Sequence, residues 1–466
     1  ESDANFRVKT KNGGMRTYYG YISANKTGFR NADIDSAVLK NAFYLENLNT
    51  YQNINWRENF GVGWKITTGI SFSTNKDDMN NELQDANNQK KVITNPSFYA
   101  FKNFKLNNSA QYAQARVVLD KKLNSLNVIR FGADYFYSKE KSTYTLYDGT
   151  KFTESVTDNL ESVFAEADLF ITNDLAAKVG GRVEHSAIVN KWNVAPRVSV
   201  AYKFRDNSQA SFAYGLFYQN PERKYLPAVA SLDFSRAAHY ILQYQKISKD
   251  RTFRVEAFYK KYTDLYKTAT SPTGREVATN NNGFGDAKGL EFFFRDKKTF
   301  KNVDYWISYS YLDTKRDYLN YPQAITPSFA ANHTAAFVIK KFVLPWKTGF
   351  NVSYNFATGR PYYRFAYDNT QSKYVIADAG KTINYNSMSF SVNYLPKLGK
   401  TNAKSFIVWV LGINNVLGQN QVFNYNYNNA GTRKEAVTPP SKRFIYIGCF
   451  ISFGIDRTQD AINNNL

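Results

Sequence analysis

Alternating apolar and polar residues recur along the whole chain, and this pattern limits the possible folds more than any other feature. Clear examples are residues 197–204, 349–356 and 387–394, which read RVSVAYKF, GFNVSYNF and SMSFSVNY. Successive side chains of a strand point to opposite faces, so each segment has one apolar and one polar face. Because the pattern fills 466 residues without a helical period, we predict one large antiparallel transmembrane β-barrel, apolar outside and wet inside.

The composition agrees with strands that cross a membrane. Mean hydropathy is −0.51, and the longest nearly unbroken apolar run, Phe406 to Ile413, is far shorter than the ~20 residues that a spanning helix needs. Aromatic residues make up 17% of the chain, and β-barrels carry aromatic girdles at both membrane interfaces. No linker or second composition zone interrupts the chain, so we expect one domain.

Short polar connections alternate with longer ones, as periplasmic turns and extracellular loops do in outer-membrane barrels. Lys121–Leu126 is short, whereas Asn75–Ser109 and Lys141–Asn159 are long. Counting the segments between connections gives about 19 strands, with both the first and the last running toward the periplasm. Complete single-chain barrels have even strand numbers, about 22 in transporters with a plugged lumen. We therefore expect an N-terminally incomplete barrel over residues 1–454 and a polar periplasmic C-terminal tail over 455–466.

The start of the chain fits that expectation. The sequence opens at Glu1 without Met or a signal peptide, and the segment Asn5–Lys11 already alternates. We expect the first strands, and anything N-terminal to the barrel, to lie before Glu1.

Several charged residues occupy the polar face in the middle of predicted strands. A lipid-facing charge at the membrane midplane costs about 2–4 kcal/mol, so these side chains are expected to face the lumen. They would either solvate the inner wall or pair with a protein plug that fills it, and the sequence leaves both readings open. The residues are Lys178, Arg182, Glu184, Arg197, Arg254, Glu256, Glu291 and Arg295.

The formal net charge of +21 permits attraction to anions such as outer-membrane lipid and lipopolysaccharide, although solvated loops and turns explain it more simply. No basic helix or Arg-rich arm is present, so nucleic acid is not an expected partner. The single cysteine, Cys449, cannot form an internal disulfide and falls on the apolar face of the last strand.

The last predicted strand ends in aromatic and aliphatic residues. Tyr446, Gly448, Ile451 and Phe453 have the spacing of the C-terminal signal read by the barrel-assembly machinery of outer membranes. Such proteins usually stop at the terminal aromatic residue, whereas this chain continues to Leu466.

An ordered series of short segments resembles the barrel of TonB-dependent outer-membrane receptors, and the Asn, Lys and Tyr richness is most similar to the Bacteroidota type. The segments are Ala195–Lys203, Ala287–Glu291, Thr358–Tyr363, Leu411–Leu417 and Pro440–Phe444. The resemblance implies a receptor that imports a scarce extracellular ligand with energy from the inner membrane. It also implies contact with the TonB complex through N-terminal parts, and leaves room for a surface lipoprotein partner.

The sequence offers little catalytic chemistry. Its three histidines, His185, His239 and His333, are far apart, and no zinc-protease or serine-hydrolase motif occurs. Asp233 and His239 lie near one rim and could form an enzyme-like pair, but this pairing is one of many that chance would produce. We expect no enzyme activity, cofactor or metal.

Two other functions remain open from the sequence, a passive porin and a structural or secretion-complex barrel with the same fold. If the receptor reading holds, a small-molecule, glycan or peptide ligand should contact the extracellular loops. The contacts we expect are Tyr225, Arg360, Tyr362, Tyr363 and Arg364, although an interfacial aromatic girdle would also explain the tyrosines.

Overall fold

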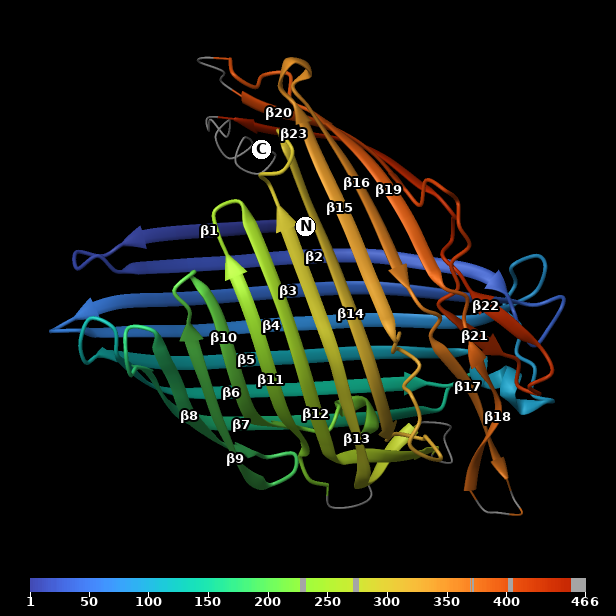
Figure 1. Ribbon diagram of the computed structural model, residues 1–466. Coiled ribbons are helices and arrows are strands. Elements are labelled where there is room, and N and C mark those ends of the chain that lie inside the picture. The colour runs from blue at the N-terminus through green and yellow to red at the C-terminus, as the bar shows by residue number, and fades with distance from the viewer. Residues whose placement is uncertain (227–231, 271–275, 369, 371–372, 401–404, 454–466) are drawn as a thin grey trace.

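The computed structural model describes residues 1–226, 232–270, 276–368, 370, 373–400 and 405–453 (Figure 1). The first strands are β1 (Ser2–Lys9), β2 (Met15–Ala32), β3 (Lys40–Phe60), β4 (Trp64–Gln84), β5 (Phe104–Lys122), β6 (Val128–Thr145), β7 (Lys151–Phe170), β8 (Leu175–Ser186), β9 (Lys191–Lys203), β10 (Ser208–Gln219) and β11 (Ser235–Ile247). The later strands are β12 (Arg251–Thr270), β13 (Glu276–Asp296), β14 (Val303–Asp317), β15 (His333–Val343), β16 (Thr348–Ala357), β17 (Pro361–Asp368), β18 (Lys373–Lys381), β19 (Tyr385–Tyr394), β20 (Ser405–Asn414), β21 (Asn424–Tyr427), β22 (Lys434–Val437) and β23 (Phe444–Phe453). The helical segments of the described residues are the 3-10 turns η1 (Ser97–Lys102), η2 (Arg223–Tyr225) and η3 (Leu344–Trp346).

One antiparallel sheet of 19 strands forms the wall, and each strand pairs with the next wall strand along the chain. Two small hairpins, β17–β18 and β21–β22, lie outside this sheet. Figure 1 shows the wall curling around a central space, with both hairpins at the end where the longer connections gather. The prediction of a large antiparallel barrel with about 19 strands is confirmed.

The two faces of the sheet differ in chemistry. Large apolar side chains on one face are more than half exposed, among them Ile54, Ile70, Val163 and Leu242. Asn, Ser and charged residues occupy the alternate positions. The buried apolar clusters of the described residues are small and lie near the strand ends. This distribution fits a wall with hydrocarbon outside and water or protein inside. No helix among the described residues is both long and apolar enough to cross a membrane.

Several strands are longer than the hydrophobic alternation predicts. The segment 141–159, expected as a long loop, is strand except for residues 146–150, and β4 continues through Asn75 to Gln84. These expectations about loop length were wrong for a physical reason. Beyond the membrane both faces of a strand meet water, so backbone pairing continues while the apolar and polar alternation disappears.

The sheet has two edges among the described residues, since no pairing joins β1 to β23. Nineteen alternating strands place β1 and β23 in the same direction, both running toward the short-turn end. A direct pair between them would therefore be parallel. The predicted tail at 455–466 lies outside the described residues.

Candidate functional site

The two hairpins at the long-loop end are held together by a polar and aromatic cluster. The rings of Tyr362 on β17 and Tyr425 on β21 lie 4.6 Å apart between centroids. Lys434 on β22 donates to the hydroxyl of Tyr362 at 3.0 Å and to Asp378 on β18 at 3.3 Å. The hydroxyl of Tyr427 donates to Asp378 at 2.6 Å. We call these five residues the hairpin clasp.

Electrostatics keep the clasp charged at neutral pH. The hydrogen bond to Tyr362 and the contact with Asp378 raise the pKa of Lys434. Hydrogen bonds from Tyr427 and Lys434 lower the pKa of Asp378. Burial, followed by the hydrogen bond to Asp378, raises the pKa of Tyr427 to about 12. The Lys434 ammonium group lies beside the Asp378 carboxylate and over the rings of Tyr362, Tyr425 and Tyr427, and both kinds of contact stabilise a cation.

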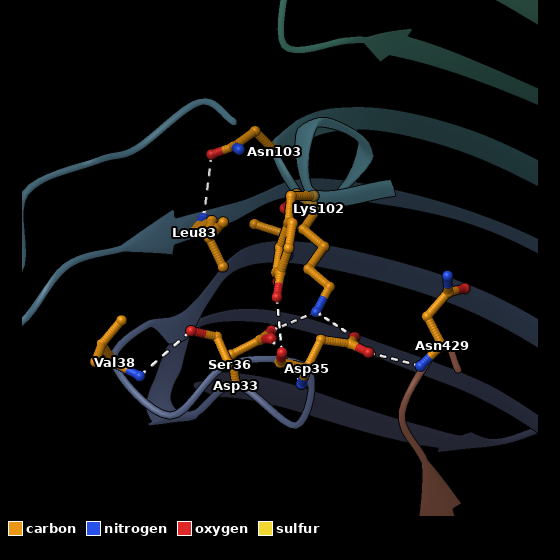
Figure 2. Close-up of polar contacts among 10 residues, drawn as sticks. Asp33, Asp35, Ser36, Val38, Leu83, Lys102, Asn103 and Asn429 are labelled. Carbon is orange, nitrogen blue, oxygen red and sulfur yellow. Dashed lines mark hydrogen bonds and ion pairs between the residues drawn. The ribbon is translucent and has the colours of Figure 1, made fainter. Parts of the chain in front are cut away.

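A second cluster ties the first connections of the chain to the last (Figure 2). Lys102, at the end of η1, donates to Asp33 at 2.5 Å and to Asp35 at 2.7 Å. The backbone amide of Asn429, beyond β21, donates to Asp35 at 2.6 Å. The hydroxyl of Tyr99 donates to the Asp35 carbonyl at 2.7 Å. We call these five residues the loop latch; it joins the β2–β3 and β4–β5 connections to the tip of the β21–β22 hairpin.

The loop latch is partly removed from water, with the side chains of Lys102, Asp33 and Asp35 exposed by 19%, 2% and 10%. Burial raises the pKa of Asp35, but hydrogen bonds from Lys102 and Asn429 outweigh it, and the pKa lies below its ordinary value. Burial lowers the pKa of Lys102, but its bonds to both aspartates leave that pKa raised. Both shifts favour the charged pair.

The predicted ligand residues occupy different environments. Tyr225 in η2 is only 6% exposed and packs in an apolar cluster beneath the connections, which favours a packing role. Tyr362 belongs to the hairpin clasp. The hydroxyl of Tyr363 donates to the Thr326 carbonyl at 3.0 Å. The guanidinium of Arg364 lies against Gly431, which has φ +71° at the tip of the β21–β22 hairpin. Among these residues, only the side chain of Arg360 is exposed.

Arg360 lines a cavity of about 560 Å³ on the inner wall, together with Arg254, Glu291, Ser308, Asn355 and Phe423. The cavity extends from Arg254 and Glu291, in the short-turn parts of β12 and β13, toward the long-loop end. Two arginines and one glutamate give it a positive balance. It therefore offers an anionic group both charge and hydrogen-bond donors.

A second inner cavity, of about 730 Å³, is lined by β4 to β11 near the short-turn end. Ion pairs within one strand and between strands line its wall. Arg182 contacts Asp134 at 2.7 Å and Glu184 at 2.5 Å. Lys178 lies 3.3 Å from both Glu166 and Asp168. The charges of this region are thus paired with the wall itself.

The remaining predicted lumen residues share the inner face. Arg197 lies over the ring of Phe217 at 4.8 Å, and Arg254 lies over Phe293 at 5.9 Å. Arg295 donates to Asp304 at 2.8 Å. Glu256 accepts from Gln243 at 3.3 Å and lies opposite Glu291 in the β12–β13 register. No ligand or plug contact follows from this placement alone.

The predicted assembly residues lie on β23, on two different faces. Tyr446 and Gly448 lie on the inner face, where the Tyr446 ring covers Gly412 of β20. Ile451 and Phe453 lie on the outer face with exposures of 51% and 76%. Their role in assembly stays a prediction.

Neither loop cluster could be recognised from the sequence, although Tyr362 of the hairpin clasp is among the predicted ligand contacts. Asp33, Asp35 and Lys102 stand in polar segments without periodicity, and Asn429 is separated from Asp35 by 394 positions. His239 stacks on Phe217 at 4.5 Å, while Asp233 pairs with Lys191 at 2.6 Å. No group of three or more metal-ligating side chains forms among the described residues.

Comparison with known proteins identifies the family. Residues 2–416 match the family model described as TonB dependent receptor-like, beta-barrel. The chain therefore belongs to this family of outer-membrane receptors and transporters. A search of curated proteins finds no match.

Solved structures show the same fold at low sequence identity. The outer membrane transporter YddB from Escherichia coli is 12% identical with a TM-score of 0.67, over 97% of this chain and 74% of that chain. The FrpB iron transporter from Neisseria meningitidis is 10% identical with a TM-score of 0.71, over 97% and 72%. The pyoverdine receptor FpvA from Pseudomonas aeruginosa PAO1, bound to pyoverdine, is 10% identical with a TM-score of 0.65, over 96% and 76%.

Proposed function

We propose that this chain forms the barrel of a receptor that binds a scarce ligand at its long-loop end and imports it into the periplasm with energy relayed through TonB. The proposal rests mainly on the long-loop end of the barrel, which we call the mouth. There the loop latch and the hairpin clasp hold the connections together above the inner cavity. The family match supports the same reading.

We also propose an anionic group on the ligand, held by Arg360 and Arg254. Arg360 is exposed in the cavity, and Arg254 lies deeper on the same wall. The iron transporter and the pyoverdine receptor among the structural relatives support a chelated metal as the first class to test. Tyr363 and Arg364 then shape the mouth, since their side chains are engaged by the protein.

We propose that further strands close the wall in the whole receptor. Unpaired backbone edges are costly in hydrocarbon, and both β1 and β23 offer one. Because these edge strands run in the same direction, an odd number of additional strands restores antiparallel pairing throughout. We propose that such strands accompany a lumen plug in the whole receptor, that the C-terminus is periplasmic, and that the receptor is of the Bacteroidota type.

Energy coupling is tested in cells that carry the whole receptor. Surface binding and uptake of siderophores loaded with radiolabelled iron, pyoverdine among them, are measured with TonB present and deleted. We expect deletion to abolish uptake while surface binding remains. Equal uptake in both strains would support a passive pore and overturn the proposal.

The Arg360 assignment has its own test. Arg360→Gln should weaken binding of the transported ferric siderophore by at least about tenfold, since a charge-assisted hydrogen bond contributes about 1.5–3 kcal/mol. Arg433→Gln is the matched control, because Arg433 lies at the same end but pairs with Glu435. Equal affinities of the two variants in a fluorescence titration would remove Arg360 from the site.

A further inference from the structure

The outer face of β6 changes character along its length. Its outward side chains include Ile129 and Phe131 near the short-turn end, then Tyr135 and Tyr137, and then Lys139 and Lys141. Aromatic girdles mark the membrane interface of a barrel, and lipid headgroups lie just beyond the hydrocarbon. The two lysines therefore stand at the level of the headgroups on the long-loop side.

Neighbouring strands add three more lysines to the same face. Lys141 faces Ser109 of β5, which in turn faces Lys76 of β4. Lys105 of β5 faces Thr145 of β6, which faces Lys151 of β7. At the usual spacings of strands and residues, the group covers roughly 15 by 20 Å. We call these five exposed residues the lysine face: Lys76, Lys105, Lys139, Lys141 and Lys151.

These charges have few compensating partners. Among the described residues, no ion pair within 4.0 Å joins a lysine of the lysine face to a carboxylate. The outward residues of β6 at positions 139, 141, 143 and 145 each define a row with the residues opposite them on β4, β5 and β7. In these four rows the only carboxylate is that of Asp78, which accepts from Asn107. Glu82 lies one row further, accepts from Asn80 at 3.0 Å and interacts electrostatically with Lys105, so Lys105 is partly compensated, whereas Lys76, Lys139 and Lys141 are not paired with a carboxylate of the described residues within 4.0 Å.

The outer wall on β11 to β14 has a different arrangement at the same end. Lys288 pairs with Asp313 at 3.3 Å, and Lys261 and Lys315 both face Asp286 across the strands. Lysines there alternate with aspartates. The two regions of the outer wall thus differ in how far their lysines are paired with carboxylates.

We propose that the lysine face binds the phosphate groups of glycolipids in the outer leaflet. Lysine is a compact cation that binds phosphate as a point charge, and several lysines at headgroup height suit a lipid that carries more than one phosphate. The inference rests on the membrane placement of the barrel and not on its ligand or energy coupling. The lysine face would then hold a lipopolysaccharide-type lipid against the receptor beside β6.

The experiment uses the whole receptor in nanodiscs of neutral phosphatidylcholine, titrated with fluorescent diphosphorylated lipid A. The triple variant Lys76→Gln, Lys139→Gln, Lys141→Gln should bind this lipid at least about tenfold more weakly, since each basic residue near an anionic surface contributes to affinity. The matched control, Lys261→Gln, Lys288→Gln, Lys315→Gln, removes the same charge from the compensated wall and should bind as the parent does.

Three results would overturn the inference: equal loss in both triple variants, equal binding of dephosphorylated lipid A, or displacement of the lipid by inorganic phosphate at equal concentration. Heat-modified gel migration confirms that each variant folds. The TonB-dependence of uptake is measured on the same variants. If the lysine triple variant binds lipid A as the parent does while uptake still depends on TonB, only the lysine-face inference is refuted. If the parent receptor binds lipid A through the lysine face but its uptake does not depend on TonB, only the proposed function is refuted.

Discussion

Replacing Lys102 with Met is expected to open the loop latch and release the β2–β3 and β4–β5 connections from the tip of the β21–β22 hairpin. Lys102→Met keeps the apolar stem but leaves Asp33 and Asp35 without their cation. Removing one partner of a buried ion pair costs about 3–5 kcal/mol. Hydrogen exchange at the Asn429 amide should therefore accelerate by more than about a hundredfold, since local opening sets that rate.

Lys26→Met is the control, because the Lys26–Glu46 pair is exposed by 77% and 60%. Surface pairs contribute about 0–1 kcal/mol, so exchange in the latch should not change. Unchanged exchange at Asn429 in Lys102→Met would show that the latch does not hold the connections together.

The same contacts predict how the latch responds to pH. The pKa of Asp35 lies below its ordinary value of 3.8, so its contribution is present above that value and is lost as the pH falls through the lowered pKa. The pKa of Lys102 lies above its ordinary value of 10.5, so its contribution is present below that value and is lost at still higher pH. Protection of Asn429, corrected for intrinsic exchange, should stay level between about pH 5 and 10.

The membrane part of the fold can be predicted from the sequence because apolar and polar residues alternate within the wall strands themselves. In segments such as 197–204, hydrocarbon on one face and water on the other demand opposite chemistry at successive residues. The inner charges could be assigned for the same reason. Arg182 cannot face lipid, so the alternation that places Val183 outside also places Arg182 inside, where it meets Asp134.

The mouth could not be predicted in the same way. Above the membrane both faces of a strand meet water, and Asn, Lys and Asp fill strands such as the upper half of β4 as readily as loops. The latch depends on three connections that meet only when the sheet curls. Tyr225 is an example. A tyrosine in a loop can bind ligand or pack against the protein, and the residue type alone does not distinguish the two roles. In the structure Tyr225 is buried.

Replacing Leu242 with Lys is expected to destabilise the barrel in a bilayer by about 2–4 kcal/mol, the cost of a lipid-facing lysine near the midplane. Leu242 lies in the middle of β11, is 59% exposed and stands between the outward Tyr240 and Tyr244. Urea unfolding of the whole receptor in lipid vesicles measures the change.

Gln243→Lys supplies the matched control one position away. Gln243 faces the inside and donates to Glu256, so a lysine there gains a carboxylate partner and should change the free energy of unfolding by less than about 1 kcal/mol. The next alternate residues, Ile241 and His239, line the second inner cavity. Because one residue of register separates lipid from lumen, equal destabilisation by both lysines would refute the assignment of the two faces. The placement of the Arg360 cavity in the lumen and of Lys139 beside the lipid headgroups both depend on that assignment, so the same result would refute both.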